Sequence, residues 1–111
     1  MKKVIATVLA VLSVLFVLSA CGQKKADYPT AAKAETALNA GKDLKGKTVT
    51  FKITGYEPKS AFGYNMETGK HLNFVSNDNP GVKKGDTVTV KIKKVASTLG
   101  SFIITYTDLQ K

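Results

Sequence analysis

The chain has one thiol and one imidazole, and these two groups are the first candidates for chemistry. Cys21 and His71 are the only cysteine and the only histidine among the 111 residues. A zinc site needs several nitrogen, sulfur or carboxylate ligands, and a nucleophilic site needs a serine or thiol beside an oriented base. No spacing in the sequence supplies His71 with such partners, and no phosphate-binding loop or zinc motif occurs. We therefore predict no enzymatic activity, no metal site and no cofactor.

The charge of the chain is strongly basic. Seventeen basic residues face 8 acidic ones, which gives a net charge of +9, and every basic residue is a lysine. A lysine is a hydrated point charge without the planar fork that binds phosphate at two points. Such a surface suits diffuse attraction to anionic lipid, wall polymer or nucleic acid. The same charge can also serve solubility alone, without any anionic partner. The sequence leaves both interpretations open.

Aromatic and polar side chains concentrate between residues 56 and 74. Tyrosine and phenylalanine can stack on bases or sugars, and lysines attract anions. The alternative is that Phe62 or Tyr64 fills the core together with Phe74. The candidate ligand-binding residues are Tyr56, Tyr64, His71, Asn73, Lys91 and Lys93.

The first 20 residues have the pattern of an export signal. Two lysines at positions 2 and 3 precede an apolar run from residue 4 to residue 18, and the small residues Ser19 and Ala20 follow. A run of about 15 residues is short for a membrane-spanning helix and long enough for a secretory signal. An uncleaved N-terminal anchor is the alternative, and it also leads out of the cytoplasm.

The tetrapeptide Leu18-Ser19-Ala20-Cys21 resembles the lipobox of bacterial lipoproteins. The resemblance implies that residues 1–20 are a lipoprotein signal peptide and that the Cys21 thiol is acylated. Residues 21–28 then form a lipidated tether. We expect a protein bound to the cell membrane through the lipid on Cys21, on the extracytoplasmic face.

One helix is predicted after the tether, within residues 29–41. Pro29 fixes a backbone angle that suits a helix start, residues 30–40 are rich in alanine, and Gly41 suits a helix end. A helix this short is marginal alone. It either covers the core of the domain or binds a partner.

The rest of the chain, residues 42–111, alternates between apolar and polar residues as strands do. In the segment Thr48–Thr54, the alternation predicts that Val49, Phe51 and Ile53 face inward. Gly55–Lys59, which contains Pro58, is predicted to be a turn. Further strands are expected at 61–66, 71–75, 87–95 and 101–107, with a loop at 76–86. Short strands at this spacing indicate an antiparallel barrel or sandwich.

Two segments resemble the OB-fold of bacterial exported proteins related to the tRNA anticodon-binding family. They are Gly46–Phe51 (GKTVTF) and Val82–Val90 (VKKGDTVTV). Residues 61–65 and 71–75 also resemble a pattern of uncharacterised lipoproteins from Gram-positive bacteria. The resemblance implies an all-β, five-stranded, OB-fold-like antiparallel barrel with one N-terminal α-helix. Residues 76–86 hold too many turn formers for the helix that many OB-folds carry there.

The sequence thus predicts a lipid-anchored, non-enzymatic binding module of the cell envelope. The expected ligand is an anionic polymer, an oligosaccharide or an envelope protein. The alternatives are an accessory subunit of a membrane protein complex, or extracellular nucleic-acid binding, which follows only from fold analogy and charge. No small-molecule substrate is predicted.

Overall fold

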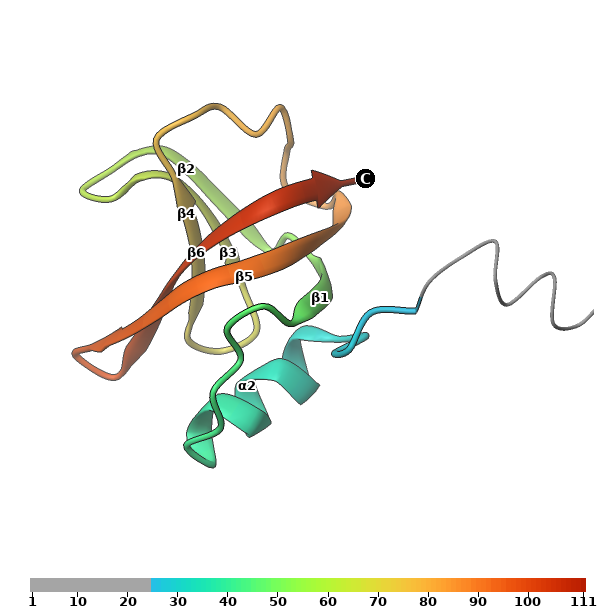
Figure 1. Cartoon of the computed structure of the whole chain (residues 1–111). Coiled ribbons are helices and arrows are strands. Elements are labelled where there is room, and N and C mark those ends of the chain that lie inside the picture. The colour runs from blue at the N-terminus through green and yellow to red at the C-terminus, as the bar shows by residue number, and fades with distance from the viewer. Residues whose placement is uncertain (1–24) are drawn as a thin grey trace, which may run out of the picture.

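A computed structural model describes residues 25–111 of the chain. The predicted signal peptide, Cys21 and the first part of the predicted tether lie outside the described residues. One helix, α2 (Ala31–Asn39), precedes a region made of strands (Figure 1). The strands are β1 (Thr48–Lys52), β2 (Gly55–Ser60), β3 (Gly63–Thr68), β4 (Leu72–Ser76), β5 (Thr87–Thr98) and β6 (Ser101–Gln110).

All six strands belong to one mixed sheet in the order β1-β5-β6-β4-β3-β2. Every neighbouring pair is antiparallel except β4 and β6, which run parallel. The all-β class is confirmed, but the expected five-stranded antiparallel barrel is wrong in strand number and in strand direction. The sheet is also not closed as a six-stranded barrel, because β1 and β2 are its two edges.

The extra strand is β2, which occupies the segment predicted to be a turn. Tyr56 and Glu57 pair with β3, and the register shifts between Glu57 and Ser60. Pro58 lies inside this irregular stretch. Proline lacks the N–H that a central strand must donate, so it is tolerated at an edge or a bulge. The turn prediction was wrong because it assumed that Pro58 cannot belong to a strand. An edge strand accommodates it.

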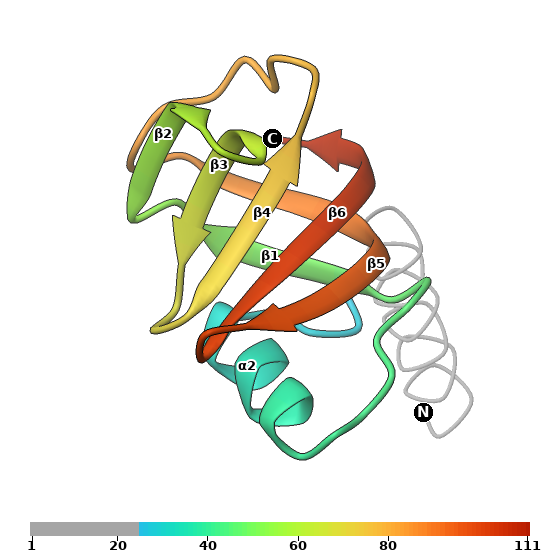
Figure 2. The same cartoon turned by 90° about the vertical axis from the view of Figure 1, so that its left-hand side faces the viewer.

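The two edge strands are joined by two residues, Ile53 and Thr54. Ile53 N donates to Asp86 O at 2.8 Å, and Thr54 N donates to Glu67 O at 2.9 Å. The chain therefore leaves one edge of the sheet and enters the other across a short bend. Figure 2 shows the resulting curl, with β3, β4 and β6 toward the viewer and β1 behind them.

The core lies on the inner side of this curled sheet, and the predicted alternation of β1 and β5 is confirmed. The buried residues are Val49 and Phe51 of β1, Ile53 just after it, and Val88, Val90 and Ile92 of β5. Opposite them, Phe74 is fully buried, and its ring stacks on Phe51 with centroids 4.2 Å apart. Of the two alternatives for Phe74, the core alternative holds.

Helix α2 covers one end of the core. The Thr30 side chain accepts from Lys33 N at 3.2 Å and so caps the first turn. Gly41 has a φ of +81°, the left-handed conformation in which helices commonly end. Ala34, Ala37 and Leu38 are buried against the sheet. The helix is confirmed where the sequence predicted it, and its apolar side belongs to the core.

Candidate functional site

Tyr56 and Tyr64 point to the inner side of the sheet. Tyr56 pairs with the buried Met66, and Tyr64 lies two residues before Met66 on β3. Burial, and then the neighbouring Tyr64, raise the pKa of Tyr56. Burial also raises the pKa of Tyr106 on β6, against the opposing effect of the Ser76 side chain. Both predicted tyrosines thus lie half-buried on the core side of the sheet.

His71 lies in the turn before β4, against the helix. Its Nδ1 is 3.1 Å from Glu35 Oε2, while Lys70 N donates to Glu35 Oε1 at 2.8 Å. Glu35 belongs to α2 and is only 6 % exposed. His71 therefore attaches the β3–β4 turn to the helix, and it is separate from the two tyrosines.

Asn73 lies on the outer side of the sheet in a ladder of side-chain amides. Asn65 Nδ2 on β3 donates to Asn73 Oδ1 at 3.1 Å, and Asn73 Nδ2 donates to Phe102 O on β6 at 3.3 Å. The buried Oδ1 of Asn65 has no hydrogen-bond partner among residues 25–111. A buried amide oxygen without a partner is unusual, so the ladder has one acceptor left for water or a ligand.

Paired residues on neighbouring strands share a face, and the pairs around Asn73 define a surface that we call the amide face. It consists of the outward side chains of β3, β4 and β6, which are Asn65, Glu67, Asn73, Ile103 and Thr105, together with Val75, which is itself only 4 % exposed. Glu57 of β2 extends the face on one side, and Lys94 and Ala96 of β5 extend it on the other. The face therefore combines amides, apolar groups, two carboxylates and one lysine.

Two hairpin tips flank the amide face. Phe62 lies between β2 and β3 and is 51 % exposed, and Leu99 lies between β5 and β6 and is fully exposed. Within the described chain, these two are the only large hydrophobic side chains with such exposure. Both tips project toward the left in Figure 1, and in Figure 2 β3, β4 and β6 lie between them. A single exposed apolar residue is normal on a protein surface, so the interest of these two lies in their positions beside the amide face.

A small hollow lies at one end of the amide face. Its lining includes Glu67, Asn73 and Ser101, and its volume is about 150 Å³. Pockets for drug-sized ligands are larger, at roughly 300–1,000 Å³. A ligand of the amide face therefore has to lie along the strands, with only one small group entering the hollow.

Lys91 and Lys93 are exposed on β5. Lys91 precedes the register shift between Ile92 and Lys94, and Lys93 lies within it. Lys91 pairs with Thr48 of β1 and Thr107 of β6. The six candidate residues thus do not form one site. Two are on the core side and two follow β5. Asn73 belongs to the amide face, and His71, which touches the helix, lines the small hollow at the end of that face together with Asn73.

The sequence reasoning did not select Asn65, Ile103 or Leu99. Asn65 and Ile103 join Asn73 only through strand pairing, and β4–β6 pairing is parallel. Leu99 did carry a sequence signal, because a large apolar residue beside a turn glycine, Gly100, has no core to enter. Its φ of +49° is uncommon for a leucine and places it at the hairpin tip.

Two other features, a cluster of metal ligands and a membrane-spanning helix, are not found in the part of the chain that the structure describes. No group of three or more histidine, cysteine, aspartate or glutamate side chains is arranged to hold a metal ion in residues 25–111. None of the helical structure in that range is long and apolar enough to cross a membrane.

Comparisons with known proteins add no further assignment. No protein-family model, no curated protein and no solved structure matches the chain.

Proposed function

We propose that the chain is a lipid-anchored, extracytoplasmic binding module that holds a glycan on its amide face. One observation carries this proposal. The two large apolar side chains exposed among the described residues, Phe62 and Leu99, lie on two separate hairpin tips on either side of a face rich in side-chain amides. An aromatic ring that stacks on a sugar and amides that bind its hydroxyls form a suitable combination for oligosaccharide recognition.

We also propose that the fold is an OB-like barrel. When β1 and β2 are counted as two halves of one bent strand, the order β2-β3-β4-β6-β5-β1 returns to the strand where it began. The sheet still has six strands, of which β1 and β2 are treated as one bent element for this comparison. OB-folds bind oligosaccharides and oligonucleotides on their second and third strands and on two adjacent loops. By this count those strands are β3 and β4, and those loops are the tips with Phe62 and Leu99.

The charges of the amide face favour a glycan over an anionic polymer or a nucleic acid. Glu57 and Glu67 extend from the face, Lys94 lies on its border, and Lys70 lines the hollow at its end, so the two lysines are balanced by two carboxylates. The whole chain has a net charge of +9, so this face is poor in positive charge compared with the rest. A polyanion needs several lysines or arginines along its path, whereas a neutral sugar chain does not.

The lipid anchor depends on the Cys21 motif. Replacing Cys21 with serine removes the thiol that receives the lipid, so we expect the protein in the soluble fraction of the producing cells. Persistence of an uncleaved Cys21→Ser protein in the membrane fraction contradicts the lipid anchor. Glycan binding is measured separately and does not depend on this result.

Binding is tested with the full chain in detergent against three probes of different chemistry. They are chitotetraose as a neutral glycan, poly(glycerol phosphate) as an anionic polymer, and oligo-dT as single-stranded DNA. We expect chitotetraose to bind with little change between 50 and 300 mM salt, as measured by calorimetry. Stronger binding of either polyanion, weakening steeply with salt, contradicts the glycan proposal.

A protein partner is the second candidate, and the complete exposure of Leu99 favours it. Aliphatic side chains contribute apolar area to protein interfaces, whereas sugars prefer aromatic rings. If Leu99→Ser abolishes retention of an envelope protein by the purified chain and no glycan probe binds, the accessory-subunit function replaces the glycan function.

A further inference from the structure

The point at which the tether joins the fold is fixed on β1. The Asp27 carboxylate accepts from Thr48 N at 3.0 Å, and Asp27 N donates to Thr48 Oγ1 at 2.9 Å. Tyr28 then pairs with β1, because its N–H donates to Thr48 O and its carbonyl accepts from Thr50 N, both at 2.9 Å. From Asp27 onward the chain is therefore part of the domain.

Few residues separate this point from the predicted lipid. From Cys21 to Asp27 there are six residue steps (27 − 21), and an extended chain spans at most about 3.5 Å per residue. If Cys21 is lipidated, as the proposed function requires, Asp27 lies within roughly 20 Å of the lipid. The β1 side of the domain is then the membrane-proximal side, and the distance is set by covalent geometry.

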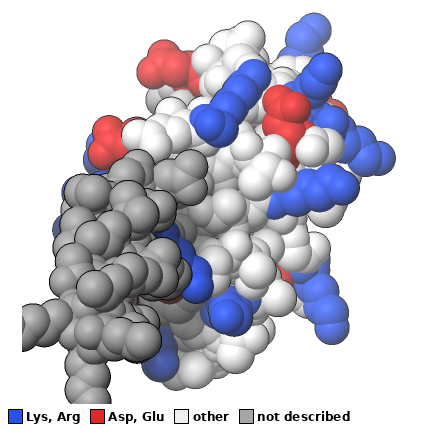
Figure 3. Space-filling view, turned by 90° about the vertical axis from the view of Figure 1, so that its right-hand side faces the viewer, with Lys and Arg blue, Asp and Glu red and all other residues white. Residues whose placement is uncertain are grey.

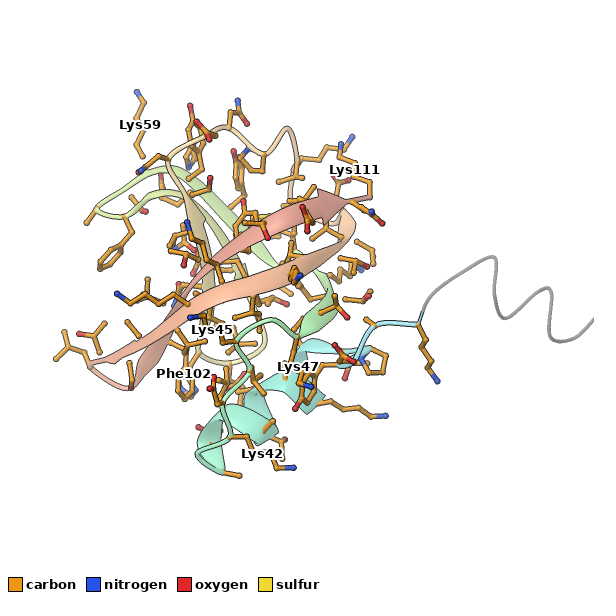
Figure 4. All side chains as sticks on the ribbon, in the orientation of Figure 1. Lys42, Lys45, Lys47, Lys59, Phe102 and Lys111 are labelled. Atoms are coloured by element: carbon orange, nitrogen blue, oxygen red, sulfur yellow. The ribbon has the colours of Figure 1, made fainter. Side chains whose placement is uncertain are left out.

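Four lysines surround this segment, and we call them the tether-side lysines. Lys25 and Lys91 line one hollow of about 440 Å³, together with Asp27 and Asp108. Lys52 lines a second hollow, which also includes Pro29, two residues before α2. Lys47 lies close to Asp27, as Figure 4 shows beside the entry of the chain. Figure 3 shows this side of the molecule, with lysines spread over it and few acidic groups.

The acidic groups near these lysines do not cancel them. The hydrogen bond from the Thr48 backbone lowers the pKa of Asp27, and the Thr48 hydroxyl and Lys47 lower it further, so it stays below its ordinary value although burial raises it. Asp27 therefore carries one negative charge, and its carboxylate is hydrogen-bonded to Thr48. Asp108 is the other acidic residue in the hollow. Four lysines against two aspartates leave this side with an excess of positive charge.

We propose that the tether-side lysines, Lys25, Lys47, Lys52 and Lys91, contact the anionic headgroups of the membrane that holds the lipid anchor. Headgroup attraction acts on basic residues held within about one Debye length of the surface, roughly 8 Å at physiological salt. The anchor provides attachment, and the lysines determine which side faces the bilayer. The hairpin tips with Phe62 and Leu99 project away from the tether (Figure 1), so this orientation presents the amide face to the envelope.

The test uses the mature lipidated protein, reconstituted in vesicles, with lysine acetylation read by mass spectrometry. One vesicle is pure phosphatidylcholine, and the other contains 30 % phosphatidylglycerol. On the anionic vesicles we expect acetylation of Lys47, Lys52 and Lys91 to slow at least threefold relative to Lys59, and to recover in 0.5 M salt. Lys59 is the internal reference because it lies on β2, far from the tether (Figure 4).

Co-sedimentation separates failure of this proposal from failure of the lipid anchor. If the protein does not sediment with phosphatidylcholine vesicles, the anchor is absent and the lipid-anchored part of the proposed function is wrong. If it sediments with both kinds of vesicle but all lysines are acetylated at the same relative rates on both, the lipid anchor is supported. The proposed contact between the tether-side lysines and the headgroups is then wrong. Glycan binding is independent of either result.

Matched charge reversals give a second readout. Lys91→Glu and Lys59→Glu change the net charge equally, and both side chains are exposed on strands. Lys91→Glu should reduce the protection of Lys47 and Lys52 on anionic vesicles at least twofold, and Lys59→Glu should leave it unchanged. Equal effects of the two variants overturn the proposal, because a response to net charge alone requires no particular face.

Discussion

The carboxylate of Glu35 lies 3.1 Å from Nδ1 of His71 and joins the helix to the β3–β4 turn. Its other oxygen accepts from Lys70 N at 2.8 Å, so both oxygens bind the same turn. Gly69 belongs to this contact, because a Cβ added there would collide with Glu35 Oε1. Helix α2 is thus held by a specific polar contact as well as by the apolar side of Ala34, Ala37 and Leu38.

Replacing Glu35 with alanine should destabilise the domain by about 1–3 kcal/mol, because two hydrogen bonds to a nearly buried carboxylate are lost. For a domain of this size, each kcal/mol corresponds to a shift of roughly 4–8 °C in the melting temperature. Glu67→Ala is the control, since Glu67 is an exposed carboxylate on β3. Equal melting temperatures for the two variants contradict a structural role for Glu35.

The same contact predicts a loss of stability in acid. Burial raises the pKa of Glu35, but the hydrogen bonds from Lys70 and His71 outweigh burial and leave the pKa below its ordinary value of 4.5. A carboxyl group with a lowered pKa in the folded state stabilises the fold above its unfolded pKa, and this contribution disappears as the pH falls. Stability should therefore decline below about pH 4.5, and urea midpoints measured from pH 6 to pH 3 check it.

The Glu35→Gln variant is the control for the acid measurement. Glutamine does not titrate, so the part of the decline that is due to Glu35 should be missing from the variant. If the stability of Glu35→Gln declines between pH 5 and pH 3 as steeply as that of the original chain, other carboxylates cause the effect.

The strand pattern could be predicted from the sequence because each alternating segment contains the signal in its own residues. Val49 and Phe51 on β1, Ile53 just after β1, and Val88, Val90 and Ile92 on β5 are buried as predicted. The helix was also predictable, because Thr30, the alanines and Gly41 are local signals. The turn prediction at residues 55–59 was wrong, because Pro58 is compatible with an edge strand and only the pairing with β3 defines that edge.

The candidate site was less predictable, because it depends on which strands become neighbours. The pattern of β4 puts Asn73 on the outer face, and the sequence prediction recognised this. The partners of Asn73 are Asn65 on β3 and Phe102 on β6, and Phe102 is 29 residues away along the chain. Tyr64 and His71 were grouped with Asn73 through proximity in sequence, but alternation directs Tyr64 inward and the turn directs His71 to the helix.

Two phenylalanines should respond to alanine substitution in opposite ways. Phe74 is fully buried and stacks on Phe51, so Phe74→Ala should cost about 3–5 kcal/mol of folding free energy. Phe62 is 51 % exposed, so Phe62→Ala should change stability by less than about 0.5 kcal/mol.

Under the proposed function, Phe62→Ala should weaken chitotetraose binding about tenfold, because the stacking ring is lost. Urea unfolding and calorimetry measure the two quantities separately. Unchanged glycan affinity in Phe62→Ala removes this hairpin tip from the site.

Gly63 and Gly100 offer a matched test of how closely the hairpin with Phe62 approaches β4. Both glycines have a positive φ, +96° at Gly63 and +80° at Gly100, so alanine at either position should cost about 1–2 kcal/mol of backbone strain. They differ in the space around them. A Cβ at Gly63 would lie 2.5 Å from the backbone oxygen of Ser76, whereas nothing lies within 4 Å at Gly100.

Gly63→Ala should therefore be less stable than Gly100→Ala by roughly another 1–3 kcal/mol, the usual cost of overpacking. The difference arises because the clash is with backbone atoms at the end of β4, which cannot rotate away as a side chain can. Urea midpoints of the two variants measure it. Equal midpoints indicate that the β2–β3 hairpin can shift away from Ser76 without loss, and that Phe62 is then not held in a fixed position beside the amide face.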